Sequence, residues 1–262
     1  MSVGDAPVVR LGDPDGPYRR RIRMIATGPG VVEGALEDDF HHFEVTLRHG
    51  GGHVTGIEAR SRRWPWSTCP DAAAHLRPLE GMELSVRCTA VAQVADPRMN
   101  CTHQFDLAGL CVSHAARGIE RRQYDAELPP TVDGVTRPRL WRDGDVLLEW
   151  TLSTRDGRAK LVESPPYDDG PWRGGFFRWA DEHLDPDDGE AAIVLRRACE
   201  IGMGRGMDLE AYDVAGELGP MMAGVCYTMQ PAVAPVAFRN RGSIRDFAHH
   251  PDALLMRTPP AS

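Results

Sequence analysis

The chain has 262 residues and a formal net charge of -8, because 38 acidic residues outnumber 30 Lys and Arg. A chain of this length forms one large domain or two modest ones and can bury a core without disulfide bonds. The acidic balance argues against nucleic-acid binding, which requires a basic surface. No apolar signal segment opens the sequence, and no apolar run approaches the roughly 18 residues of a membrane span, so a cytoplasmic protein is expected.

The first 118 residues predict a leader, two β-hairpins and two helices. Residues 1–18 are rich in Gly, Pro and Asp and predict a loose leader. Alternating apolar residues and glycine-containing turns predict two hairpins, with strands at 19–28 and 31–38 and at 41–49 and 53–62. Helices are predicted from Cys69 to the Pro78–Gly81 region and over 100–118, with residues 82–94 ambiguous between strand and helix.

The second part of the sequence predicts strands followed by helices. Its turns contain Asp-Gly pairs at 143–144 and 156–157. The predicted strands lie within 121–129, 136–152 and 158–164, and the predicted helices are 176–184 and 189–204. The fold class is therefore α+β, with antiparallel β-hairpins packed with helices in a motif-bearing domain, 19–118. A second α+β part, 119–262, would close a pocket.

Residues 37–53 hold four of the ten histidines. Side chains alternate between the two faces of a strand, so His41 shares the apolar face with Phe43 while His42 lies on the polar face. His49 and His53 flank a triple-glycine turn and are expected to face solvent. A buried, unpaired imidazole costs about 1–3 kcal/mol. His41 is therefore either a core-edge histidine bonded to backbone or a functional ligand or base.

Two cysteine-containing segments offer partners for His41. Cys69 and Asp71 open one predicted helix, where backbone N–H groups and the helix dipole favour a thiolate. Cys101 and His103 open the other. Neither pair has the spacing of a zinc finger, so a joint site would require the fold to bring the pairs together.

Four short motifs resemble an uncharacterised bacterial family, a domain of unknown function found in catabolic gene neighbourhoods. The resemblance covers roughly residues 19 to 117. Its motifs here are His41-His42-Phe43, Cys69-Pro70, Leu79-Glu80-Gly81 and Cys101-Thr102-His103-Gln104. The family has His-Asp-Met and Cys-Thr-His-Leu, so His42 replaces an acidic residue and Gln104 a leucine. The layout is also similar to iron–sulfur cluster scaffold proteins, which implies Cys69, Asp71 and Cys101 as ligands with a histidine replacing a third cysteine.

These residues predict an enzyme with non-redox chemistry, such as hydration, dehydration, isomerisation or hydrolysis. His41 and His103 would be acid–base residues or metal ligands, with Asp71 or Glu58 as the partner carboxylate. If zinc is bound, two or three side chains would hold it and leave a position open for water or substrate. The candidate ligands are His41, Cys69, Cys101 and His103.

Phe43, Trp64 and Trp66 would line a pocket for a small, partly apolar substrate. No nicotinamide or flavin fingerprint is present, neither nucleic acid nor membrane is an expected partner, and a homo-oligomer is compatible with the sequence. The alternative is a non-catalytic accessory protein that binds zinc or an iron–sulfur cluster. A third reading makes the motifs structural parts of a binding module.

Overall fold

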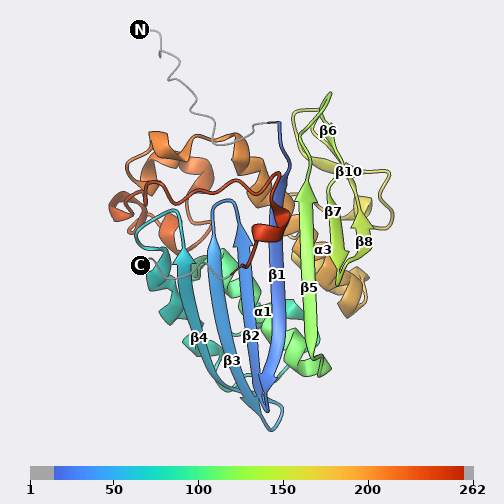
Figure 1. Cartoon of the computed structure of the whole chain (residues 1–262), viewed down its shortest axis with the longest axis vertical. Coiled ribbons are helices and arrows are strands. Elements are labelled where there is room, and N and C mark those ends of the chain that lie inside the picture. Colours follow the sequence, from blue (N-terminus) through green and yellow to red (C-terminus); the bar gives the residue numbers. More distant parts are fainter. Residues whose placement is uncertain (1–14, 257–262) are drawn as a thin grey trace.

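The computed structural model describes residues 15–256, which form an antiparallel seven-stranded sheet, a small second sheet and helices. The α+β prediction is confirmed. The large sheet has the order β4-β3-β2-β1-β5-β7-β8, with the bounds β1 Tyr18–Gly28, β2 Val31–Asp38, β3 His42–Gly50, β4 His53–Arg63, β5 Arg121–Leu128, β7 Arg139–Arg142 and β8 Asp145–Glu149 (Figure 1). The small sheet has the order β10-β9-β6, from β6 Val135–Thr136, β9 Thr151–Ser153 and β10 Lys160–Val162.

Both predicted N-terminal hairpins are present, and glycine makes the first possible. β1 pairs with β2 and β3 with β4, all antiparallel. Gly30 in the first turn has φ 68°, and a Cβ atom there would lie 2.3 Å from the carbonyl oxygen of His49. The predicted Asp143-Gly144 turn joins β7 to β8, with positive φ at both residues as a two-residue hairpin requires.

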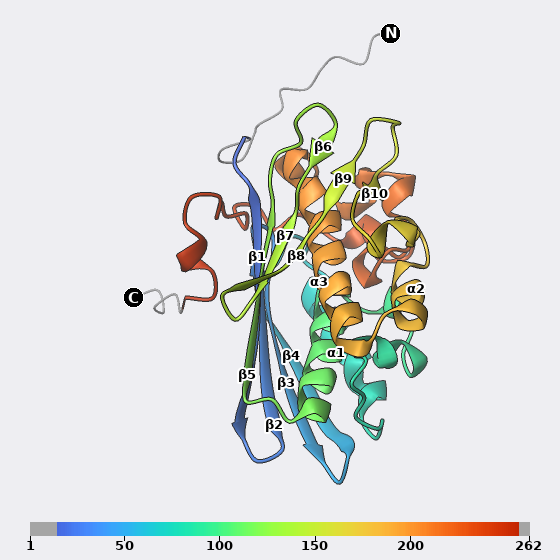
Figure 2. The same cartoon turned by 90° about the vertical axis from the view of Figure 1, so that its right-hand side faces the viewer.

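The helices cover one side of the large sheet (Figure 2). They are α1 Thr102–Arg117, α2 Phe176–His183 and α3 Pro186–Gly202. α1 ends at Gly118, whose left-handed φ of 62° confirms the predicted stop. It lies so close to β2 that a Cβ atom at Gly34 would be 2.5 Å from the Cys111 sulfur. This close approach brings the first turn of α1 near the sheet.

The other helical segments are 3₁₀ helices. The predicted helix beginning at Cys69 is one of these, and the ambiguous 82–94 segment contains another instead of a strand. Their bounds are η1 Cys69–Leu79, η2 Cys88–Gln93, η3 Pro97–Met99, η4 Tyr167–Asp169, η5 Met203–Gly206, η6 Leu209–Ala211, η7 Ala215–Leu218, η8 Pro220–Met222, η9 Tyr227–Met229, η10 Ala234–Val236 and η11 Pro251–Ala253. None of the helices in residues 15–256 has both the length and the apolar character to cross a membrane.

The large sheet runs across the predicted boundary between residues 118 and 119. β1 pairs with β5 over eight residue pairs, among them Ile22 with Tyr124. Tyr18, which the predicted leader includes, is buried and begins β1, so this strand starts one residue earlier than predicted. The predicted leader otherwise falls mostly on residues 1–14, which lie outside the described residues.

The C-terminal segment crosses the side of the sheet opposite the helices (Figures 1 and 2). Arg19 Nε donates to the Ala248 carbonyl at 3.0 Å and Arg21 Nη1 to the Leu254 carbonyl at 3.3 Å. The Leu255 N–H donates to Glu37 Oε2 at 2.7 Å. These contacts hold the end of the described chain against β1 and β2.

Candidate functional site

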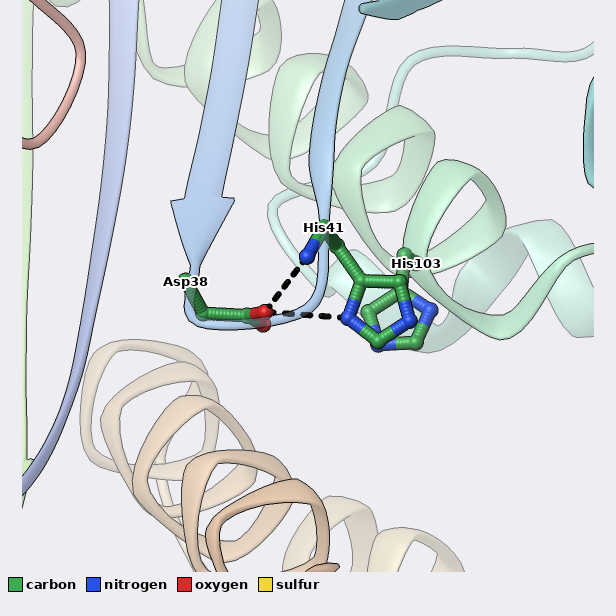
Figure 3. Close-up of side chains that lie close together, drawn as sticks. All are labelled: Asp38, His41 and His103. Carbon is green, nitrogen blue, oxygen red and sulfur yellow. Dashed lines mark hydrogen bonds and ion pairs between the residues drawn. The ribbon is translucent and has the colours of Figure 1, made fainter. Parts of the chain in front are cut away.

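Asp38, His41 and His103 meet where the β2–β3 connection approaches α1 (Figure 3). Asp38 ends β2, His41 directly precedes β3, and His103 lies in the first turn of α1. One potential ligand atom from each residue lies within 4.8 Å of the others, and all three residues are buried. This group could bind a metal ion.

The Asp38 carboxylate is the most heavily bonded member of the group. Its Oδ1 accepts from the backbone N–H groups of Phe40 and His41, both at 2.8 Å, and from His41 Nδ1 at 3.0 Å. Its Oδ2 accepts from Tyr18 at 2.9 Å and from Arg20 at 3.1 Å. Burial alone would raise the pKa of Asp38, but His41 and Arg20 outweigh it and hold that pKa well below its usual range. The carboxylate is therefore ionised and its acceptor positions are largely filled.

The bond from Asp38 determines which nitrogen of His41 is available. The proton that Nδ1 donates to Asp38 leaves Nε2 with the free lone pair. No other hydrogen bond to this ring occurs within residues 15–256. Burial lowers the pKa of His41 below its usual 6.5, although Asp38 opposes the change. His41 is thus a neutral imidazole at neutral pH.

His103 stacks on His41, with ring centroids 3.7 Å apart and an angle of 28° between the planes. Burial and the neighbouring His41 lower the pKa of His103 well below 6.5, so this ring is also neutral. Its Nδ1 lies 4.0 Å from the Cys101 sulfur. Its Nε2 is buried without a hydrogen-bond partner in the described part of the chain. A buried polar atom of this kind calls for an explanation, and a bound metal or ligand would supply one.

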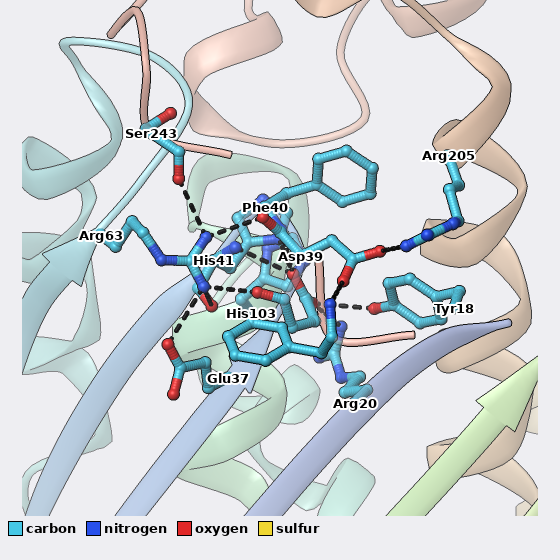
Figure 4. Close-up of polar contacts among 12 residues, drawn as sticks. Tyr18, Arg20, Glu37, Asp39, Phe40, His41, Arg63, His103, Arg205 and Ser243 are labelled. Carbon is cyan, nitrogen blue, oxygen red and sulfur yellow. Dashed lines mark hydrogen bonds and ion pairs between the residues drawn. The ribbon is translucent and has the colours of Figure 1, made fainter. Parts of the chain in front are cut away.

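Arg63 fixes the loop that carries Asp38 and His41 (Figure 4). Its guanidinium donates to the carbonyl oxygens of Asp38, Asp39 and His41 at 2.5, 2.8 and 3.1 Å. It also bonds the Glu37 carboxylate and the carbonyl of Ser243, both at 3.1 Å. The loop is therefore held between β4 and the C-terminal segment before any ligand arrives, as a preorganised site requires.

No protein-family model, curated protein or solved structure shows a significant match to the chain. The geometry of Asp38, His41 and His103 is therefore the basis for assigning a function.

The structure brings together two of the predicted site residues, His41 and His103, and places Phe43 beside them. Phe43 is fully buried, and its ring centroid lies 5.8 Å from each imidazole. Trp66 is buried in the same apolar cluster as Phe43, and Trp64 packs against that cluster. These aromatic side chains form part of the core next to the histidines.

Cys69 and Cys101 were predicted as metal ligands, but neither belongs to the group. Both are buried in the apolar cluster with Phe43. Cys69 accepts a hydrogen bond from Thr228 with a sulfur–oxygen distance of 3.6 Å, and burial raises the pKa of its thiol to about 12. Burial also raises the pKa of Cys101 well above its usual value. Both cysteines pack as protonated, small apolar side chains.

The carboxylate beside the histidines is Asp38, whereas Asp71 or Glu58 was predicted. Both predicted acids are exposed. Glu58 lies on the polar side of β4, opposite Thr46 of β3. A local signal for Asp38 was present in the sequence. An Asp side chain commonly accepts from backbone N–H groups two and three residues ahead, which turns it toward the residue three positions on, here His41.

The lowered pKa values of His41 and His103 predict that the fold becomes less stable in acid. Each folded-state pKa lies below the unfolded value, so the stabilisation is complete above pH 6.5 and is lost as the pH falls toward the folded pKa. Each histidine contributes up to about 1.4 kcal/mol per pH unit in that window. His103→Phe keeps a stacking ring but removes one titrating group. Urea denaturation should therefore show that the free energy of unfolding falls less between pH 7.5 and pH 5.5 in this variant than in the wild-type protein. The exposed His53→Gln is the control, and equal losses in all three proteins would contradict the assignment.

Proposed function

We propose that the protein is an enzyme whose centre is a zinc ion bound by His41 and His103. The observation that carries the proposal is the pair of buried, neutral imidazoles. One is oriented by a carboxylate, and the other has a nitrogen without a partner. Neutral imidazole is the form that binds metals, and a carboxylate that accepts from the second ring nitrogen is a frequent companion of such a ligand.

The donor set favours a catalytic site over a closed structural one. Structural zinc sites usually have four protein ligands, whereas catalytic sites leave a position for water or substrate. The group within residues 15–256 has three members, and the Asp38 oxygens already accept from five donors. Asp38 is therefore assigned to orienting His41. The four-ligand accessory protein is the weaker interpretation.

Zinc in such a site would supply a water molecule of lowered pKa and an electrophile for a carbonyl oxygen. The chain would supply the orientation of the ligands, through Asp38 and the loop that Arg63 holds. Hydrolysis, hydration, dehydration and isomerisation are the reaction classes that this chemistry serves without redox change.

Metal-free acid–base catalysis is the second candidate. The specific observation in its favour is the 3.0 Å bond between Asp38 and His41 Nδ1, which orients an imidazole for proton transfer at Nε2. Metal binding separates the two candidates.

Metal analysis and competition titration with a coloured zinc chelator test the proposal. Wild-type protein should bind about one zinc per chain, and His41→Ala and His103→Ala should lose it. Asp38→Asn removes the charge that supports His41, so its affinity should fall roughly 10- to 100-fold. The control is His53→Ala, because His53 is exposed and begins β4.

Circular dichroism should show that each variant is folded before titration. Zinc affinity unchanged in both histidine variants would refute the metal centre. A folded wild-type protein that binds no metal would leave metal-free acid–base catalysis. Bound iron that reacts with oxygen would contradict the non-redox assignment.

A further inference from the structure

A cleft of about 490 Å³ lies among the helices on the covered side of the sheet. Its walls come from α1, α2, α3 and the 3₁₀ helix Cys88–Gln93, and β1 forms its floor. The volume lies within the range of small-molecule sites. Neither His41 nor His103 lines it, so the cleft is a feature separate from the proposed metal centre.

The cleft runs from an exposed mouth to a buried floor. Ala92, Gln93 and Arg178 line it and are exposed, whereas Arg20 of β1 lines it and is 1% exposed. The walls between are mainly apolar and buried. They include Ile22, Val91, Phe105, Leu110, Ile193 and Val194. A ligand with an apolar body could therefore be covered along most of its length.

Arg20 is the unusual element of this cleft. Its Nη1 donates to Asp38, but its Nε is buried without a hydrogen-bond partner among the described residues. Burying a guanidinium is costly unless its donors are satisfied. A ligand oxygen at the floor of the cleft would accept from the remaining donors.

The arginine donors in the lining of the cleft favour a ligand that ends in an oxygen acceptor. This lining contains three arginines and two aspartates, and Asp38, which lies outside the lining, is the counterion of Arg20. The thiol of Cys88 stays neutral because burial raises its pKa. Arg197 is paired with Asp106 at 2.6 Å. Asp181 lies near the mouth and bonds Thr89. Arg20 is paired with Asp38 at 3.1 Å, but its Nε has no partner among the described residues, so Arg20 is the buried arginine of the lining that still has a donor for an entering oxygen.

We propose that this cleft binds an apolar carboxylic acid, with its carboxylate at Arg20 and its hydrocarbon part between α1 and α3. The inference goes beyond the proposed metal chemistry and does not require a metal. Asp38 bonds both Arg20 and His41, so a carboxylate held at Arg20 would lie two hydrogen bonds from the histidine pair.

Calorimetric titration of the wild-type protein with octanoate, 1-octanol and octylamine tests the proposal. Octanoate should bind at least about tenfold more tightly than either of the others, because a charge-assisted bond to Arg20 adds to the same apolar burial. Ala92→Trp narrows the mouth and should weaken octanoate binding at least about tenfold. Ala74→Trp is its matched control, because Ala74 is also exposed but lies outside the cleft.

Arg20→Lys keeps the positive charge but loses the planar set of donors, so it should remove most of the preference for octanoate over octanol. Octanoate that binds no more tightly than octanol, or equally well to Ala92→Trp, would overturn the proposal. Zinc titration of Ala92→Trp keeps the two proposals apart, because this variant should retain wild-type zinc affinity whether or not it binds octanoate.

Discussion

Replacing Asp38 by alanine should lower the free energy of unfolding by roughly 3–5 kcal/mol, because removing one member of a buried ion pair strands the other. Arg20 would keep its charge at 1% exposure without a counterion. The backbone N–H groups of Phe40 and His41 and the Tyr18 hydroxyl would lose their acceptor as well. Urea denaturation of the apoprotein at pH 7.5 measures the change.

Glu44→Ala is the matched control for Asp38→Ala. Glu44 pairs with Arg62 on the open side of the same sheet, where Arg62 is 51% exposed, and such pairs contribute about 0–1 kcal/mol. In the double variant Asp38→Ala with Arg20→Met, the free energy of unfolding should fall by less than the sum of the falls in the two single variants, because no buried charge is left unpaired. Similar losses of stability in Asp38→Ala and Glu44→Ala would show that the buried pair contributes no more to stability than the exposed one.

Glu190→Ala should be the second strongly destabilising variant, again by roughly 3–5 kcal/mol, because it removes one partner of a buried ion pair and an acceptor for two hydroxyl groups. Arg122 keeps only its second ion-pair partner, Asp187, at 3.2 Å. Glu190 on α3 is 2% exposed. It accepts from Tyr124 of β5 at 2.7 Å, from Arg122 at 2.9 Å and from Ser113 of α1. The residue thus ties a helix of the second part to the sheet and to α1.

Thermal unfolding provides the measurement for Glu190→Ala. A loss of that size corresponds to a fall in Tm of roughly 6–20 °C for a chain of this length. Glu149→Ala removes an exposed pair with Arg139 and should shift Tm by only a few degrees. Equal shifts in the two variants would mean that the buried carboxylate does not join the two parts as described.

Local patterns in the sequence were enough to predict the hairpins and the main helices. Glycine turns and alternating apolar residues predict β1 to β4, and the 3/4 spacing around Leu107 and Leu110 predicts α1. The pairing of β1 with β5 has no such local signal, because Ile22 and Tyr124 are about a hundred positions apart. Most of the short 3₁₀ helices after α3 likewise have no periodic pattern to reveal them.

The candidate site could likewise be predicted only in part from local patterns. Strand alternation predicts that His41 points inward, and the start of a predicted helix suggests His103. Which carboxylate joins them depends on how the loop after β2 turns, and the sequence pattern favours Asp71 or Glu58 over Asp38. The cysteines were assigned by their reactivity, whereas burial in an apolar cluster keeps them protonated.

The bond from Arg63 to Ser243 links the loop of His41 to a distant part of the sequence. One guanidinium contacts both the loop of His41 and a segment about two hundred positions later. An insertion or deletion near Ser243 would therefore move the imidazole without altering any residue of the site. Sequence length in that distant segment is constrained together with the geometry of the histidine pair, so the two are expected to vary together among related chains.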